Sequence, residues 1–146
     1  MKTILDPYKW ALEEMRKDIR EIIGKNHNTR IVWYHGHTTL KATDDETAWC
    51  SAFMCAAAEA NGFKSTRSAL ARSWLNYGEE GKGEVGDIVV LSANSRGPNA
   101  GHVGFLASPY RQGDTLIAVL GGNQSNMLRV SNYQAKDLLA FRKFVI

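Results

Sequence analysis

The chain has 146 residues, which is enough for one compact domain with a proper core and leaves no evident room for a second one. Apolar residues make up 44% of it and charged residues 23%, the balance of an ordinary soluble globular protein. The net charge is only +3, and Lys and Arg are scattered along the chain, which argues against a nucleic-acid-binding surface.

The first third of the chain predicts two helices separated by a long polar segment. Asp6 followed by Pro7 is typical of a helix start, and apolar residues at helical spacing extend the first predicted helix to about Ile23. Residues 25–45 are polar and poorly periodic, which predicts a loop with a short element at 30–34. A second helix is expected to start within the acidic run 44–47 and to continue to about Asn61.

The later part of the chain predicts a third helix and then a sheet. Residues 68–77 are expected to be helical, with Gly78 ending the helix. Five short apolar or β-branched runs follow, separated by turn residues, at 86–92, 102–108, 115–120, 127–133 and 138–144. Helices first and strands afterwards predict an α+β fold, with N-terminal helices packed on a five- to six-stranded antiparallel sheet in meander order.

Cys50 and His102 are the candidate reactive pair. Cys50 is expected on the first turn of the second helix, where the helix dipole favours a thiolate. His102 opens a predicted strand between Gly101 and Gly104, and a neighbouring imidazole can take the thiol proton and return it to a leaving group. Cys55 lies roughly 140° around the helix from Cys50, so no disulfide is expected and Cys55 is interpreted as structural.

A third polar residue usually orients the imidazole of such a pair. The strand after His102 ends in Gly121-Gly122-Asn123-Gln124, which predicts Asn123 beside the start of the His102 strand. Gln124 is the alternative, because a slip of one residue reverses the face of a strand. Trp49, Trp74, Asn99 and Gln124 are candidates for contact with substrate, and the 94–100 loop is a candidate groove wall, although both Trp side chains suit the core better.

His35 and His37 support a competing hypothesis. Two His at this spacing can share a zinc ion, with Asp44, Asp45 or Cys50 completing the ligand set. The chain lacks a His-Glu-x-x-His run and a Cys-x-x-Cys pair, so no metal or other cofactor is predicted. The acidic run 44–46 also lacks the alternating oxygen ligands of a dedicated calcium loop.

Five blocks of this chain, in order, resemble a known family. They are DDETAWCSAF at 44–53, SALARSWLNYG at 68–78, GDIVV at 86–90, GHVGF at 101–105 and LGGNQS at 120–125. They resemble small phage- and prophage-associated cysteine peptidoglycan hydrolases of the CHAP and NlpC/P60 group, over nearly the whole chain. The resemblance implies a papain-like fold with Cys50 as nucleophile, His102 as base and Asn123 as the polar third member.

The resemblance also implies a function: cleavage of an amide bond in peptidoglycan, either within stem peptides and cross-links or between N-acetylmuramic acid and L-Ala. The chain carries neither the calcium pattern of some CHAP domains nor an appended wall-binding module, as in endolysins of phages that infect Gram-negative hosts. Alternatives are an antibacterial toxin with the same chemistry and a non-catalytic wall-binding protein.

The start of the chain bears on where such an enzyme would act. No signal-peptide core and no apolar run of spanning length is present, so a monomer in the host bacterial cytoplasm, without stable membrane insertion, is expected. An endolysin of this kind would need a holin to reach the cell wall.

Overall fold

The computed structural model describes residues 6–24 and 26–146. Residues 1–5, on which the absence of a signal peptide partly rests, lie outside the described part. The helices and strands within it are, in chain order, α1 (Pro7–Met15), α2 (Thr29–His35), α3 (Cys50–Ala60), β1 (Glu79–Glu80), β2 (Ile88–Ser92), β3 (Gly101–Leu106), β4 (Leu116–Gln124), β5 (Met127–Gln134) and β6 (Leu138–Lys143), with short 3-10 helices η1 (Ala71–Asn76), η2 (Asn94–Arg96) and η3 (Ala135–Asp137). No helix in these residues is both long and apolar enough to cross a bilayer.

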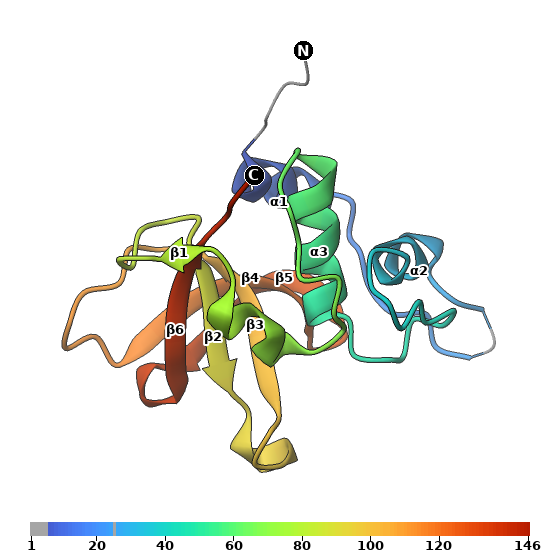
Figure 1. Cartoon of the computed structure of the whole chain (residues 1–146). Coiled ribbons are helices and arrows are strands. Elements are labelled where there is room, and N and C mark those ends of the chain that lie inside the picture. Colours follow the sequence, from blue (N-terminus) through green and yellow to red (C-terminus); the bar gives the residue numbers. More distant parts are fainter. Residues whose placement is uncertain (1–5, 25) are drawn as a thin grey trace.

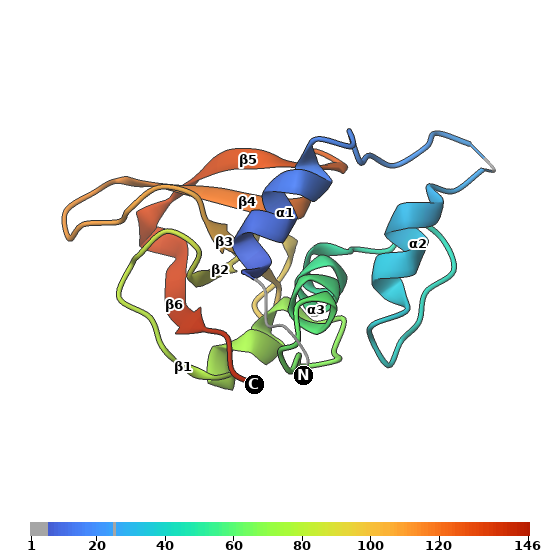
Figure 2. The ribbon, with the colours of Figure 1, turned by 90° about the horizontal axis from the view of Figure 1, so that it is seen from above.

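The fold is α+β, as predicted, with one antiparallel sheet in the order β1-β6-β2-β3-β4-β5. Strands β2 to β5 form the predicted meander. The last strand departs from it: β6 passes the meander and pairs with β2 on the opposite side from β3. Figures 1 and 2 show α1 and α3 on one side of this twisted sheet, with α2 on the far side of α3.

Helix α3 is the centre of the core. Its residues from Cys50 to Ala58 are all buried, because the sheet covers one side of the helix and α2 the other. The helix therefore has no solvent-facing side over these residues. Small side chains such as Ala56 and Ala57 let neighbouring elements approach closely, and Phe53 packs against the rings of Tyr34 and Phe105.

Helix α1 begins as predicted but ends eight residues early. Asp6 caps it by accepting a hydrogen bond from the Tyr8 backbone at 2.9 Å. Asp18 then adopts a left-handed conformation with φ 55°, and the following residues extend along the edge of β5, where the Leu128 backbone N–H donates to the Ile19 carbonyl. Ile23 consequently lies fully exposed instead of on a buried helical face.

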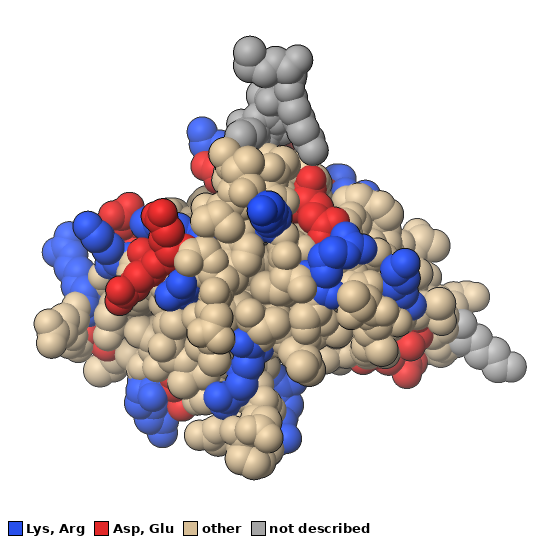
Figure 3. Space-filling model, viewed as in Figure 1, with Lys and Arg blue, Asp and Glu red and all other residues tan. Residues whose placement is uncertain are grey.

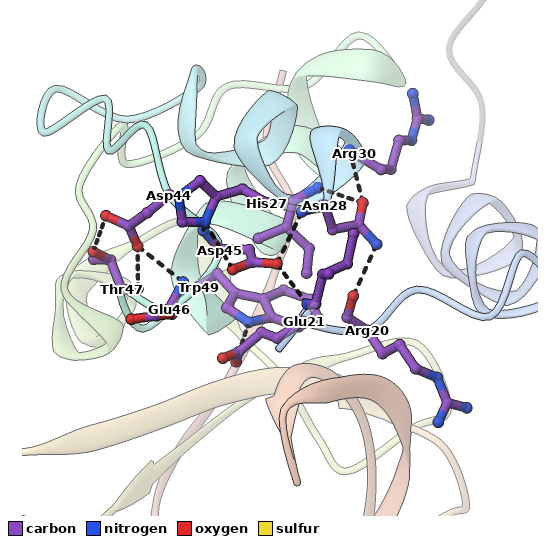
Figure 4. Close-up of polar contacts among 12 residues, drawn as sticks. Arg20, Glu21, His27, Asn28, Arg30, Asp44, Asp45, Glu46, Thr47 and Trp49 are labelled. Atoms are coloured by element: carbon purple, nitrogen blue, oxygen red, sulfur yellow. Dashed lines mark hydrogen bonds and ion pairs between the residues drawn. The ribbon is translucent and has the colours of Figure 1, made fainter. Parts of the chain in front are cut away.

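The acidic run before α3 holds a long connection in place rather than capping the helix. Asp45 is fully buried, and its carboxylate accepts hydrogen bonds from the backbone N–H groups of Ile22 and Asn28 at 2.7 and 2.8 Å (Figure 4). Asp44 closes a turn by accepting from the backbone of Glu46 and Thr47. The predicted start at 44–47 was thus too early, and α3 begins at Cys50.

Two shorter elements also bear on the predictions. The expected short element at 30–34 is helix α2, which Asn28 caps through hydrogen bonds to the Arg30 and Ile31 backbone. The expected third helix at 68–77 is reduced to η1, a 3-10 helix.

Candidate active site

Cys50 and His102 meet where the start of α3 approaches the start of β3. Both residues are only 5% exposed, and each lines a surface cavity. Strand β3 pairs with both β2 and β4, which fixes the position of His102 in the sheet interior. Two segments about fifty residues apart in the sequence therefore bring a thiol and an imidazole together, as the sequence predicts.

The two groups alter each other's protonation. Burial favours the neutral thiol, but interaction with the His102 imidazole and its charge outweighs burial and lowers the pKa of Cys50. Burial likewise opposes a charged imidazole, but the thiolate and Gln124 outweigh it and raise the pKa of His102. Both shifts favour a thiolate–imidazolium pair, which is the reactive form of a cysteine nucleophile.

Gln124, rather than Asn123, contacts the imidazole. The His102 Nε2–H donates to Gln124 Oε1 at 2.8 Å, and the Gln124 amide NH₂ donates to the carbonyls of Val119 and Arg129 at 3.0 and 2.7 Å. These two carbonyls accept from the amide nitrogen, so the amide oxygen must face the imidazole. Nε2 of His102 therefore carries a proton, and Nδ1 is the nitrogen left for the thiol.

A bulge in β4 explains why Gln124 takes the place predicted for Asn123. The pairing of β4 with β5 shifts register between Gly121 and Gln124, and Asn123 has a left-handed φ of 58°. The irregularity turns Asn123 toward the adjacent cavity and buries Gln124. The sequence-based alternative, Gln124, is thus the residue at the imidazole.

Glycine at 121 leaves room for this contact. A side chain there would place Cβ 2.5 Å from Gln124 Oε1 and 3.3 Å from His102 Nε2. Tyr133 contacts the imidazole as well. Its ring lies nearly parallel to the imidazole at 5.1 Å between centroids, and its hydroxyl oxygen is 3.3 Å from His102 Nε2. The imidazole is consequently held on two sides.

Two cavities of about 420 and 410 Å³ open beside the pair. We call the first the His-side cavity; its lining includes His102, Asn123, Gln124, Ser125, Tyr133 and Arg96. We call the second the Cys-side cavity; it is lined by Ala48, Cys50, Ala69, Leu70, Ala71, Arg72, Arg96, Asn99, Ala100 and Gly101. Arg96 belongs to both, so the cavities adjoin and give access to the pair from two directions.

The predicted substrate-contact residues divide into two groups. Asn99 is exposed and lines the Cys-side cavity, as a contact residue should. Trp49 and Trp74 are fully buried, and their indole N–H groups donate to Glu21 and to Ser51 inside the fold, at 3.0 and 2.9 Å. The core interpretation of both Trp side chains is therefore confirmed, and their proposed contact with substrate is corrected.

The zinc hypothesis has no ligand set in the described residues 6–24 and 26–146, where no group of three or more His, Cys, Asp and Glu is placed to hold a metal ion. His35 is buried at the end of α2. His37 packs edge-on against the Trp33 ring at 4.5 Å, with its Nδ1 2.9 Å from the Trp33 carbonyl oxygen. The two imidazoles thus have separate surroundings.

Cys55 illustrates a cysteine without such surroundings. It is fully buried in the middle of α3, with its sulfur 3.8 Å from the Thr66 hydroxyl and from the Ser68 carbonyl oxygen. Burial raises the pKa of its thiol, opposite to the shift at Cys50. The structural interpretation of Cys55 is consistent with this environment.

Searches with the sequence and the structure found no matching family model, no similar curated protein and no similar solved structure.

Proposed function

We propose that this protein is a cysteine amidohydrolase with a papain-like catalytic arrangement. The observation that carries the proposal is the polarised imidazole: Gln124 fixes the proton on His102 Nε2, which leaves Nδ1 to exchange a proton with Cys50. The opposite pKa shifts of Cys50 and His102 support the same assignment. A structural buried cysteine requires none of these features.

In the proposed reaction the Cys50 thiolate attacks the carbonyl carbon of an amide, which gives a tetrahedral intermediate. The first backbone N–H groups of α3 have no acceptor within the helix, and no side chain caps this end, so they can donate to the developing oxyanion. The His102 imidazolium then gives its proton to the leaving amine as the C–N bond breaks. Water, deprotonated by His102, hydrolyses the resulting thioester and restores the thiol.

The proposed substrate is peptidoglycan, and the proposed role is that of a phage or prophage endolysin. Both rest on the resemblance of the five sequence blocks, and the bond cut is a stem-peptide or cross-link bond or the bond to N-acetylmuramic acid. Two open cavities that adjoin at Arg96, one lined by His102 and the other by Cys50, suit a branched, extended peptide polymer better than an enclosed small molecule. A delivered antibacterial toxin would share this chemistry, and a holin gene or an immunity gene beside the coding sequence would separate the two roles.

The direct test compares the two cysteines. We expect Cys50→Ala to fold normally and to release no new amines from purified sacculi, whereas Cys55→Ala retains the wild-type rate. Mass spectrometry of the muropeptides then identifies the bond: free lactyl-muramic acid indicates an amidase, and a split stem or cross-link indicates an endopeptidase. Hydrolysis that survives Cys50→Ala, or that a chelator abolishes while a thiol alkylator does not, would contradict the proposal.

A further inference from the structure

Arg96 occupies the junction between the two cavities. It ends the short helix η2, is exposed, and lines both the His-side and the Cys-side cavity. Any extended ligand that passes from one cavity to the other therefore lies along its side chain. The proposed mechanism gives this residue no part, and the sequence did not single it out.

Most N–H donors of the Arg96 guanidinium remain available to a ligand. Its Nη2 donates to the Gly101 carbonyl at 3.0 Å, and within the described part of the chain no carboxylate lies at ion-pair distance from it. A guanidinium carries five N–H donors in a planar fork that matches a carboxylate. The single bond to Gly101 anchors the side chain and leaves the rest of the fork available.

The Cys-side cavity as a whole favours an anion. Its lining contains two cations, Arg72 and Arg96, and no Asp or Glu. Arg72 is engaged with the loop before β3, where it donates to the carbonyls of Pro98 and Ala100, so its charge contributes without its fork being free. In Figure 3, Lys and Arg atoms are prominent around the lower projection of the molecule, which Figure 1 shows to be the segment between β2 and β3.

The charge of Arg96 also affects the pKa values of Cys50 and His102. Beyond burial and the interaction with His102, Arg96 contributes to the lowered pKa of Cys50, and it opposes protonation of His102. Because Arg96 and Cys50 line the same cavity, a group bound by Arg96 lies in the cavity from which the thiolate is reached.

We propose that the Cys-side cavity is an anion-binding subsite in which Arg96 binds a carboxylate of the substrate next to the scissile amide. The ligand class is a peptide with a free carboxylate on the residue at, or adjacent to, the cleaved bond. Leu70 and Ala71 supply an apolar wall for the rest of that residue. The assignment of the carboxylate to a substrate rests on the proposed function, whereas anion binding beside Cys50 does not.

The first experiment needs no substrate. Cys50 is alkylated with anionic iodoacetate and with neutral iodoacetamide, and its modification is followed by mass spectrometry. We expect Arg96→Gln to lower the ratio of the iodoacetate rate to the iodoacetamide rate about three- to tenfold, because the local positive charge attracts only the anionic reagent. Any change in the pKa of Cys50 affects both reagents alike and cancels in the ratio.

Arg111→Gln is the matched control. It removes the same charge from the exposed connection between β3 and β4, outside both cavities. We expect it to leave the ratio of the two rates unchanged. An equal fall in Arg111→Gln and Arg96→Gln, or no fall in Arg96→Gln, would overturn the subsite.

The second experiment measures hydrolysis of muropeptides whose carboxylates are free or amidated. We expect Arg96→Gln to raise KM for the free acid about ten- to a hundredfold and to remove the wild-type preference over the amide, with partial recovery in Arg96→Lys. An unchanged preference in Arg96→Gln refutes the subsite and leaves the proposed function standing. If the wild type hydrolyses neither muropeptide, the proposed function fails, and the alkylation ratio still decides whether an anion binds there.

Discussion

His102 and His35 are both buried histidines, yet their surroundings are opposite in character. His102 is hydrogen-bonded to Gln124 and stacks on Tyr133. Burial lowers its pKa, but Cys50 and Gln124 outweigh burial and raise it. His35 is fully buried, and in the described part of the chain neither ring nitrogen has a hydrogen bond of normal geometry. Burial is the largest influence on His35 and lowers its pKa. Burial therefore does not mark the reactive histidine; directed polar partners do.

The largest difference should appear when each imidazole is removed. We expect His102→Gln to reduce kcat/KM for sacculus hydrolysis by about 10²- to 10⁴-fold, because the proton acceptor and donor of the proposed reaction is lost. His35→Leu should leave kcat/KM unchanged, because its ring lies in neither cavity. Circular dichroism of both variants serves as the folding control. Equal losses of activity in folded His102→Gln and His35→Leu would contradict the assignment of His102, and not His35, as the reactive histidine.

The next largest effect concerns the residue that orients His102. Gln124→Leu should lower kcat about 10- to 100-fold, because the imidazole loses the acceptor that fixes its ring. The matched change is Asn123→Gly, which keeps the left-handed backbone and removes only the side chain. We expect that change to have little effect on kcat.

A pH profile separates positioning from mere structural damage. In Gln124→Leu the pKa of His102 should fall, because Gln124 is one of the groups that raise it. Cys50 should then lose part of the support for its thiolate and alkylate over a higher pH range. A profile identical to that of the wild type would show that Gln124 only supports the fold.

The contrast between Gln124 and Asn123 shows how far sequence reasoning reaches. The α+β class and the positions of most strands follow from periodicity and turn residues, and the pairing of Cys50 with His102 follows from the chemistry of a thiol and an imidazole and from the sequence resemblance. The β4 bulge does not, because Gly121-Gly122 permits several backbone paths and only tertiary packing selects one. Sequence reasoning therefore identified both candidates for the third residue but not which of them faces the imidazole.

Other differences arise from long-range packing. Ile22 and Ile23 continue the helical period of α1, but pairing of the chain with the edge of β5 overrides it. The place of β6 beside β2 depends on a long-range pairing, and no local signal encodes it. The sequence indicates the 94–100 loop as a groove wall but does not distinguish Arg96 within it, because only the fold shows that this residue lines both cavities.

Substitution of Gly121, near His102, and of Gly36, next to His35, should change stability and activity by smaller amounts. Gly121→Ala should reduce both stability, by about 1–3 kcal/mol, and activity, because its Cβ would displace Gln124 from His102. Gly36, next to His35, has helical φ and ψ, and its added Cβ would meet only the Trp33 carbonyl oxygen at 3.2 Å. Gly36→Ala should keep full activity. Denaturant titration and sacculus hydrolysis measure the two properties separately, and an active Gly121→Ala enzyme would show that the site adapts.

The smallest effect is the dependence of stability on pH. His35 has a lowered pKa in the folded state, so below its ordinary value of about 6.5 the unfolded chain binds a proton that the folded chain resists. The free energy of unfolding should therefore fall as the pH drops from about 6.5 toward the folded-state pKa. Asp44 and Asp45, whose charges favour the protonated ring, limit this loss.

His102 changes the free energy of unfolding with pH in the opposite direction to His35, so the effects of the two histidines can be measured separately. Its raised pKa contributes stability that is fully present below about pH 6.5 and is lost as the pH rises through the folded-state value. Between the folded-state pKa of His35 and pH 6.5, denaturant titrations should show a shallower acid loss of stability in His35→Leu than in the wild type. Above pH 6.5, His102→Gln should lack the loss of stability that the wild type shows as the pH rises through the folded-state pKa of His102. Carboxylates elsewhere titrate in all three proteins, so only the differences between curves carry the comparison. Parallel curves for His35→Leu and the wild type would mean that His35 gains a proton in the folded state as readily as in the unfolded chain.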